Sequence, residues 1–258
     1  MNNIFGYPNF DKDGIKILTR TQGSYAGMMM NITIYRMEKG KSLSFSLLDE
    51  EMALLLIQGS VTYRWQGNAV SSARVDFIKE GATCLHVSKD VPVIITAAEE
   101  SEILVQSTVN DRVFESKLYT PENCGEETFG QNQFESKAQR TVRTFFDYHT
   151  APYSNMVMGE IIVPQGGWSS YPPHHHPQPE VYYYRFQRPQ GFGACFIGDD
   201  TCKIKDGSFC AIPGGLTHPQ VNAPGYPMYY VWMIRHFDGN PWTDRIYDLS
   251  HAWLLEES

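Results

Sequence analysis

Hydrophobic residues in this chain occur in short runs that turn-forming residues separate. Tyr, Phe, Trp, Val and Ile make up most of these runs, and Gly, Pro, Asn and Asp lie between them. The sequence contains no long apolar stripe with the 3.6-residue period of a helix. The pattern is typical of strands joined by turns, so the sequence predicts an all-β protein.

Two sets of strands are predicted, one in each half of the chain. The first set lies at residues 28–37, 42–48, 52–59, 61–65, 91–98 and 103–109. The second set lies at residues 155–164, 180–186, 192–198, 202–213 and 228–235. The intervening segment is polar and rich in Pro, Gly and Asn, which indicates a linker. The predicted organisation is a first domain at residues 1–115, a linker at residues 116–137 and a second domain at residues 138–258.

The runs follow a similar order in the two halves. LLLIQGSVTYRW and VYYYRFQRPQGFGACF occupy comparable places, as do DFIKEGATCLHV and KIKDGSFCAIPGG. This order favours an internal duplication, although regular β-hairpins alone could produce the same impression.

Composition and charge restrict the partners. The formal net charge of -8 argues against a nucleic-acid surface, which requires clustered Lys and Arg. The N-terminal segment MNNIFGYPNFDKDG lacks the features of a secretory signal, and no stretch approaches the roughly 18 apolar residues of a membrane span. We therefore expect a cytoplasmic protein without nucleic-acid or membrane partners. Sheet edges that need covering make a homodimer a reasonable expectation.

The cysteines form no CxxC pair, and without an export signal they are expected to be reduced. A metal role for Cys202 or Cys210 is the less favoured interpretation, because a buried free Cys commonly behaves as a small hydrophobic residue. The five cysteines are Cys84, Cys124, Cys195, Cys202 and Cys210.

The densest candidate chemistry lies in the segment YPPHHHPQPEVYYYRF. His174 and His176 are two residues apart, so on a strand both side chains face the same side. Glu180 keeps this parity if the strand is continuous, whereas His175 should face away. Two imidazoles and a carboxylate suit Zn, Mn, Fe or Ni. The alternative is a polar, proline-flanked loop with exposed histidines.

A second segment, GSFCAIPGGLTHPQVN, favours the metal site. Gly207, Pro213 and Gly215 are spaced to make tight turns, which bring the following strand back beside the first one. This arrangement would deliver His218 to the same site.

Together the two segments resemble the motifs of the cupin superfamily. The His-x-His-x3-Glu core of the first cupin motif is matched, although its flanking glycines are displaced, and the second motif is matched at every fixed position from Gly207 to Asn222. The resemblance implies a bicupin, with two jelly-roll β-barrel domains in one chain. It also implies that the metal ligands are His174, His176, Glu180 and His218.

The first half carries none of these ligands. The second motif, applied from Gly81, places Val87, Lys89, Pro92 and Thr96 where the family has Pro, Gly, His and Asn. We therefore predict a degenerate cupin without metal, in which His86 packs or caps a strand end.

A more specific resemblance covers roughly residues 155–235. The runs WSSYPPH, EVYYYRF, PQGF and the APGY-then-YY pair are similar to the 5-deoxy-glucuronate isomerase family of bacterial inositol catabolism. This similarity implies a metal-dependent aldose–ketose isomerase with one divalent ion (Zn, Mn, Ni or Fe), converting 5-deoxy-D-glucuronate to 5-dehydro-2-deoxy-D-gluconate. Only Pro177, Gln178 and Pro179 separate His176 from Glu180, where that family usually has a longer acidic insertion. The substrate could therefore be another small sugar acid.

Several residues are candidates for catalysis and substrate binding. Glu180 is a candidate proton carrier as well as a ligand, and Tyr184 is the second catalytic candidate. Tyr182, Tyr230 and Trp232 are candidates for binding the substrate, with packing as the alternative role.

The distal carboxylate of such a substrate requires a cation or several hydrogen-bond donors. Arg185 is a candidate, but strand parity places it on the face opposite Glu180. The alternatives are Lys203, Lys205 and Arg235. Trp168 is expected at the rim of the site.

The sequence is also compatible with two other classes of function. A cupin dioxygenase would use open positions on Fe(II), but the many tyrosines favour a polar substrate. A non-catalytic sugar-binding cupin is the third possibility, and no helix-turn-helix pattern supports a regulatory version of it.

Overall fold

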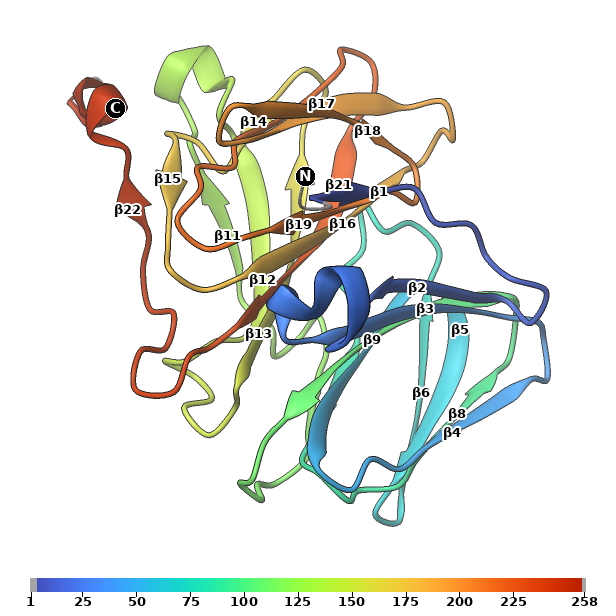
Figure 1. Ribbon diagram of the computed structural model, residues 1–258. Helices are drawn as coiled ribbons and strands as arrows, with labels where there is room; N and C mark the ends of the chain where they lie inside the picture. Colours follow the sequence, from blue (N-terminus) through green and yellow to red (C-terminus); the bar gives the residue numbers. More distant parts are fainter. Residues whose placement is uncertain (1–3, 257–258) are drawn as a thin grey trace. The chain divides into compact units, whose positions relative to one another are not determined.

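The computed structural model describes residues 4–256 and consists mainly of antiparallel strands with three short 3-10 helices (Figure 1). This confirms the predicted all-β class. Within the described residues no helix has the length and apolar character needed to cross a membrane.

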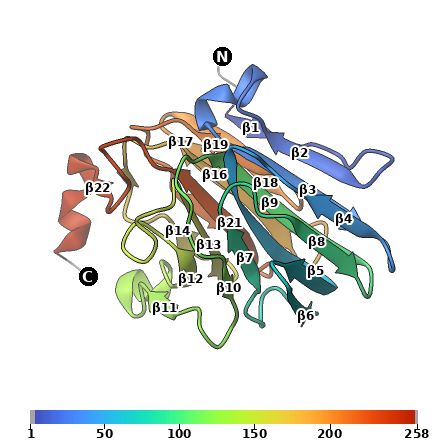
Figure 2. The same cartoon turned by 90° about the horizontal axis from the view of Figure 1, so that it is seen from below.

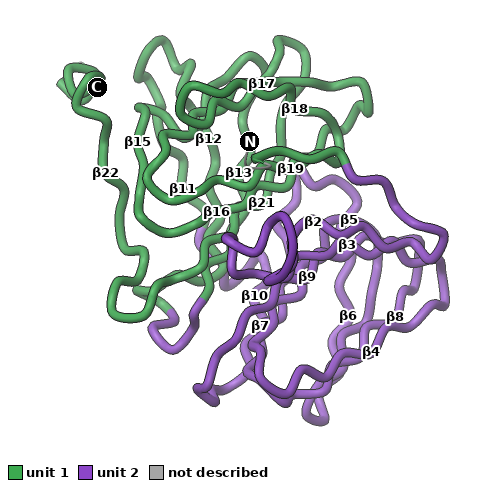
Figure 3. The backbone as a smooth tube through the Cα atoms, viewed as in Figure 1, with its two compact units in different colours: residues 1–7, 126–150, 156–258 green, residues 8–125, 151–155 purple. Residues whose placement is uncertain are grey.

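The chain forms two compact units, and each unit contains more than one segment of the sequence (Figure 3). Unit 2 comprises residues 8–125 and 151–155, and unit 1 comprises the remaining segments, up to Tyr7, 126–150 and from Met156 onward. The segment predicted as a linker contains β10 (Lys117–Tyr119), β11 (Glu126–Phe129) and η2 (Gln133–Ser136).

Unit 2 is built around one long strand. Its elements are β2 (Ile15–Thr19), η1 (Gly23–Met28), β3 (Asn31–Met37), β4 (Ser42–Phe45), β5 (Glu50–Trp65), β6 (Asn68–Arg74), β7 (Cys84–Val87), β8 (Val93–Ala97), β9 (Ser101–Val109) and β10. The first half of β5 pairs with β7 and β9, and its second half pairs with β6 and β8. Strand β5 therefore belongs to both layers that enclose the core.

Residues 52–59 and 61–65, predicted as two strands, form this single strand. Gly59 bends the strand without ending it, at a backbone φ of 109°. A Cβ at this position would lie 2.4 Å from the carbonyl oxygen of Glu100, so only glycine fits.

A buried carboxylate holds residues 151–155 to unit 2. Glu51 is fully buried and accepts hydrogen bonds from His86 Nε2 at 2.9 Å, Asn110 Nδ2 at 3.0 Å, Ser154 Oγ at 2.8 Å and the backbone N–H of Asn155 at 2.6 Å. His86, the histidine of the degenerate copy, thus lies in a buried polar network.

We expect Glu51→Ala to lower the free energy of unfolding by about 3–5 kcal/mol, because it leaves several buried donors without their acceptor. Urea-induced unfolding would measure the loss. Glu99→Ala is the control, since Glu99 makes an exposed ion pair with Lys39 that contributes under about 1 kcal/mol. Equal effects of the two substitutions would contradict the prediction.

Among the described residues, unit 1 contains a seven-stranded sheet, a four-stranded sheet and a two-stranded sheet formed by His174–His175 and Ile246–Tyr247. Its elements are β1 (Phe5–Gly6), β11, η2, β12 (Arg140–Phe146), β13 (Met156–Val163), β14 (Trp168–Ser169), β15 (His174–His175), β16 (Glu180–Phe186), β17 (Phe192–Ile197), β18 (Asp200–Lys205), β19 (Phe209–Ile212), β20 (Gln220–Asn222), β21 (Met228–Arg235), β22 (Ile246–Tyr247) and η3 (Leu249–Leu255). The seven-stranded sheet has the order β1-β19-β16-β21-β13-β12-β11, and the four-stranded sheet has the order β14-β20-β17-β18. Strands β12 and β11 lie at one edge of the seven-stranded sheet (Figure 2). The predicted strand at 202–213 is divided into β18 and β19 by a turn at Gly207, whose φ is 73°.

The core of unit 1 lies between its seven-stranded and four-stranded sheets. Alternate residues of β16 and β21 face this interior, among them Tyr182, Tyr184, Tyr230 and Trp232, and they pack against Ile204 of the four-stranded sheet. The three tyrosines therefore bring their hydroxyl groups to the interior of unit 1, on the same face as Glu180.

Candidate metal centre and its surroundings

Three of the predicted ligands converge at one end of the unit 1 interior. His176, Glu180 and His218 are all buried, and each offers a ligand atom within 4.8 Å of the others. Glu180 Oε2 lies 3.1 Å from His176 Nε2 and 3.2 Å from His218 Nε2. We call these three residues the His–Glu cluster.

The turn after β19 brings His218 to the other two. The backbone N–H of Gly215 donates to the His176 carbonyl at 2.8 Å, and a Cβ at Gly214 would lie 1.7 Å from the Pro177 carbonyl oxygen. The glycines are therefore needed for close approach of the two segments. The continuous strand from His174 to Glu180 is not formed, because β15 ends at His175 and the prolines of the Pro177–Pro179 segment lack backbone N–H donors.

The imidazole orientations suit a metal ion. In all three histidines, Nδ1–H donates a hydrogen bond to a backbone carbonyl two residues away. The acceptors are Pro172 for His174 at 2.8 Å, Gln178 for His176 at 2.9 Å and Leu216 for His218 at 2.9 Å. A histidine that donates from Nδ1 to a carbonyl can offer Nε2 to a metal ion, and this is the orientation that all three rings have.

His218 Nε2 is buried and has no hydrogen-bond partner among residues 4–256, despite its short distance to Glu180. A lone pair facing a carboxylate in a buried site is unfavourable unless a cation lies between them. The donor set therefore fits a divalent transition metal.

His174 lies beside this group rather than within it. Its ring is 5.1 Å from the ring of His218, centroid to centroid, but it is not part of the set within 4.8 Å. Its role as the fourth ligand stays a prediction. His175 is only partly buried and lies outside the cluster.

Burial lowers the pKa of His218, and it lowers the pKa of His174 well below the ordinary value, with neighbouring His218 adding to the effect at His174. In the unfolded chain both pKa values return to about 6.5. Below that pH the unfolded chain binds more protons than the folded one, so the metal-free protein loses stability as the pH falls.

We expect the chelator-treated protein to have its full free energy of unfolding above about pH 6.5 and to lose part of it between pH 6.5 and 5. Urea unfolding at several pH values would measure this. The double variant His174→Asn/His218→Asn should lose less over the same interval. An equal loss in the variant would contradict the assignment of the effect to these histidines.

Tyr182 lies beside the His–Glu cluster, and Tyr230 packs against Tyr182. The Tyr182 ring lies 6.0 Å from that of His218 and 4.7 Å from that of Tyr230. Their hydroxyl groups contact Ser170 Oγ at 3.0 Å and Ser169 Oγ at 2.6 Å. Burial raises the pKa of Tyr230 to about 12 and that of Tyr182 well above 10, so both stay protonated donors at neutral pH.

Tyr184 and Trp232 share the same inner face but have other partners. The Tyr184 hydroxyl donates to Gln220 Oε1 at 2.5 Å and lies 3.0 Å from Cys210 Sγ. Trp232 lies 5.6 Å from the ring of Trp242, and its buried Nε1–H has no acceptor among the described residues. The catalytic role predicted for Tyr184 and the binding role predicted for Trp232 stay predictions.

None of the basic residues proposed from the sequence reaches the cluster. Arg185 lies on the opposite face of β16, as parity indicated, where its Nε–H donates to Asp206 at 2.8 Å. Lys203 and Lys205 are exposed and lie over the rings of Phe192 and Tyr7. Ile234 faces the core, so the next residue, Arg235, lies on the opposite face of β21. Its Nη1 donates a hydrogen bond to the His236 carbonyl.

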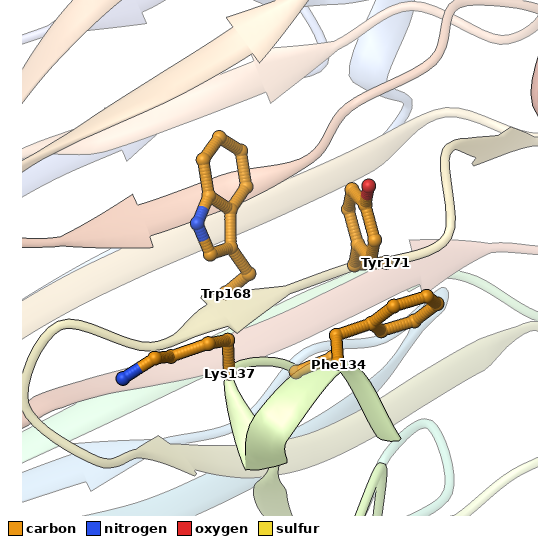
Figure 4. A pocket seen from close by; sticks show the side chains of 5 residues that line it. Phe134, Lys137, Trp168 and Tyr171 are labelled. Atoms are coloured by element: carbon orange, nitrogen blue, oxygen red, sulfur yellow. The ribbon is translucent and has the colours of Figure 1, made fainter. Parts of the chain in front are cut away.

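Trp168 also faces away from the cluster. It stacks on Phe196, 5.8 Å away, and lines a pocket of about 280 Å³ with Phe134, Lys137, Ala138 and Tyr171 (Figure 4). Its neighbour Ser169 faces inward to Tyr230. The left-handed backbone at Ser170, with a φ of 52°, allows the next serine to bond inward as well.

The sequence prediction missed several residues that surround the cluster. Ser169 and Ser170 lie in the WSSYPPH run but gave no chemical signal of their own. Tyr247 pairs with His174 in register, and Arg140 and Arg245 reach the same region from distant segments. No local pattern marks these last three residues.

All five cysteines are free, as predicted, and none belongs to the His–Glu cluster. Cys195 and Cys210 instead form part of the buried core of unit 1. This agrees with a packing role.

Comparison with solved structures supports the predicted fold. An IolB-like protein from Salmonella typhimurium LT2 matches with a TM-score of 0.87 at 19% identity, covering 98% of this chain and 99% of that one. A mutant of Bacillus subtilis oxalate decarboxylase matches with a TM-score of 0.65 at 13% identity, covering 96% and 80%. These neighbours have the cupin fold, and the predicted all-β bicupin is confirmed.

Sequence comparison identifies relatives over nearly the whole chain. A protein of Geobacillus thermodenitrificans named 5-deoxy-glucuronate isomerase is 25% identical over 271 residues, covering 96% of this chain and 93% of the relative. The Bacillus subtilis protein of the same name is 23% identical over 264 residues, covering 95% and 94%. These relatives bear out the prediction of an enzyme of the isomerase class. Residues 7–254 match the KduI/IolB family as a whole, and the chain therefore belongs to that family.

Proposed function

We propose that this protein is a metal-dependent aldose–ketose isomerase that converts 5-deoxy-D-glucuronate to 5-dehydro-2-deoxy-D-gluconate. The observation that carries the proposal is the His–Glu cluster, in which the Nε2 atoms of His176 and His218 lie 3.1 and 3.2 Å from a buried carboxylate, in a member of this family. The name shared by the relatives supplies the substrate.

The ligands in this proposal are His176, Glu180 and His218, with His174 beside them as the fourth. A bound divalent ion would supply Lewis-acid polarisation of a carbonyl oxygen. The three Nδ1–H bonds to backbone carbonyls fix the rings before anything binds, so little reorganisation is needed.

The isomerisation moves one proton from C2 to C1 and another from the C2 hydroxyl to the C1 oxygen. It therefore needs a proton carrier but no oxidant or reductant. We assign this role to Glu180, the carboxylate of the cluster. Because Tyr182 and Tyr230 stay protonated at neutral pH, they act as hydrogen-bond donors to the sugar and to charge that develops on its oxygens.

Proton NMR in deuterated buffer tests the proposal. Metal-loaded protein should remove the aldehyde signal of 5-deoxy-D-glucuronate and form the 2-keto product, and a chelator-treated sample should not. Unchanged substrate, with metal confirmed in the protein, would refute the assignment of this substrate.

A second candidate is isomerisation of another uronate. It is favoured by the short spacing of three residues between His176 and Glu180. The same NMR assay with D-glucuronate and D-galacturonate would distinguish the two, because the proposed enzyme should act on the 5-deoxy sugar far faster.

A further inference from the structure

Arg140 is a buried arginine of unit 1. It lies at the start of β12 with only 6% of its surface exposed, and it shares the parity of Val142, which packs on the inner core. Its guanidinium therefore faces the interior that holds the His–Glu cluster.

No carboxylate within residues 4–256 forms an ion pair with Arg140. Its one hydrogen bond is from Nη1 to the Ala138 carbonyl at 2.9 Å, and its guanidinium lies 5.6 Å from the Phe129 ring. Arg143, three residues later on the opposite face, instead binds two carboxylates, Glu126 and Glu160. A buried guanidinium without an anion is costly, and an anionic ligand bound beside Arg140 would offset that cost.

The surroundings of Arg140 connect it to the cluster. Its charge interacts with the hydroxyl groups of Tyr182, Tyr230 and Tyr247, and Tyr230 interacts in turn with Glu180. The two tyrosines on the inner face thus lie within electrostatic range of both charged groups.

A second cation approaches the same region. Arg245 precedes β22, interacts with both Arg140 and His174, and has a side chain 31% exposed. Its one ion pair is a long contact of 3.9 Å with the adjacent Asp244, which is mostly exposed. Burial lowers the pKa of Arg140, and Arg245 lowers it further, so an anion near both would be stabilised.

We propose that Arg140 and Arg245 form a subsite for the distal carboxylate of a sugar acid, with Tyr182 and Tyr230 binding the hydroxyl groups between it and the His–Glu cluster. The proposal rests on the proposed function, since it takes the reacting carbons to lie at that cluster. Planar guanidinium groups bind carboxylates through paired hydrogen bonds, and this contact would orient the aldehyde end of the sugar.

Binding and kinetics together test the subsite. Isothermal titration of the metal-loaded protein should show that D-glucuronate binds more tightly than D-glucose, its uncharged counterpart. Arg140→Gln and Arg245→Gln should each remove this preference. With 5-deoxy-D-glucuronate as substrate, each should raise KM by about 10- to 100-fold, with a much smaller change in kcat and unchanged metal content.

Two further variants show whether a loss of binding comes from the missing cation or from misfolding. Arg140→Lys keeps a buried cation and should retain part of the preference for glucuronate. Arg188→Gln, at an exposed arginine of the turn after β16, should change neither binding nor KM.

The outcomes separate the two proposals. Equal binding of glucuronate and glucose by the unsubstituted protein, or a preference kept in both glutamine variants, would overturn the subsite. A preference that depends on both arginines, in a protein that does not isomerise 5-deoxy-D-glucuronate, would refute the proposed reaction but uphold the subsite.

Discussion

His176→Ala and His218→Ala are each expected to abolish stoichiometric metal binding and to lower kcat/KM by at least about 1,000-fold. Each removes one of the two Nε2 atoms nearest Glu180, at 3.1 and 3.2 Å. A Lewis acid contributes several kcal/mol to transition-state stabilisation, and about 4 kcal/mol corresponds to that loss of rate. The fold should persist, because both imidazoles bond to local carbonyls and neither anchors a strand.

Metal content per chain, circular dichroism and the NMR assay would be measured on the same preparations. His175→Ala is the matched control, because this neighbouring histidine is partly exposed and outside the cluster. It should keep both metal and activity. A full complement of metal in both His176→Ala and His218→Ala would show that the cluster is not the metal site.

Strands with continuous apolar runs were predictable from the sequence. Glu180–Phe186 and Met228–Arg235 have the predicted bounds, because both contribute buried residues on both faces. Strand β12 was missed, since its sequence RTVRTFF mixes charged, polar and apolar residues without a period of two, and its two arginines are buried. Burial of those arginines depends on partners far away in the chain, such as Glu160, which no local pattern reveals.

The residues of the His–Glu cluster were predictable for a related reason. Histidines at fixed spacings beside turn-forming glycines and prolines form a local signal, and the structure brings three of the four predicted ligands together. Strand parity also placed Arg185 on the face opposite Glu180, where it donates to Asp206, and its role in substrate binding stays a prediction. Parity could not select Arg140 from the other arginines, because its inward position depends on the register of β12 against β11 and β13.

Glu180→Gln is expected to lower kcat by about 100- to 10,000-fold even at saturating metal, whereas Glu180→Asp should retain more activity. Glutamine keeps an oxygen that can contact the cluster but cannot carry a proton, and general acid–base catalysis typically contributes this range. Aspartate keeps the carboxylate at a longer distance from C2. Deuterium incorporation at C1, measured by NMR together with metal content, separates the two roles of this residue. If Glu180→Gln binds a full complement of metal and still exchanges deuterium at the rate of the unsubstituted enzyme, Glu180 is not the proton carrier, and another group must be.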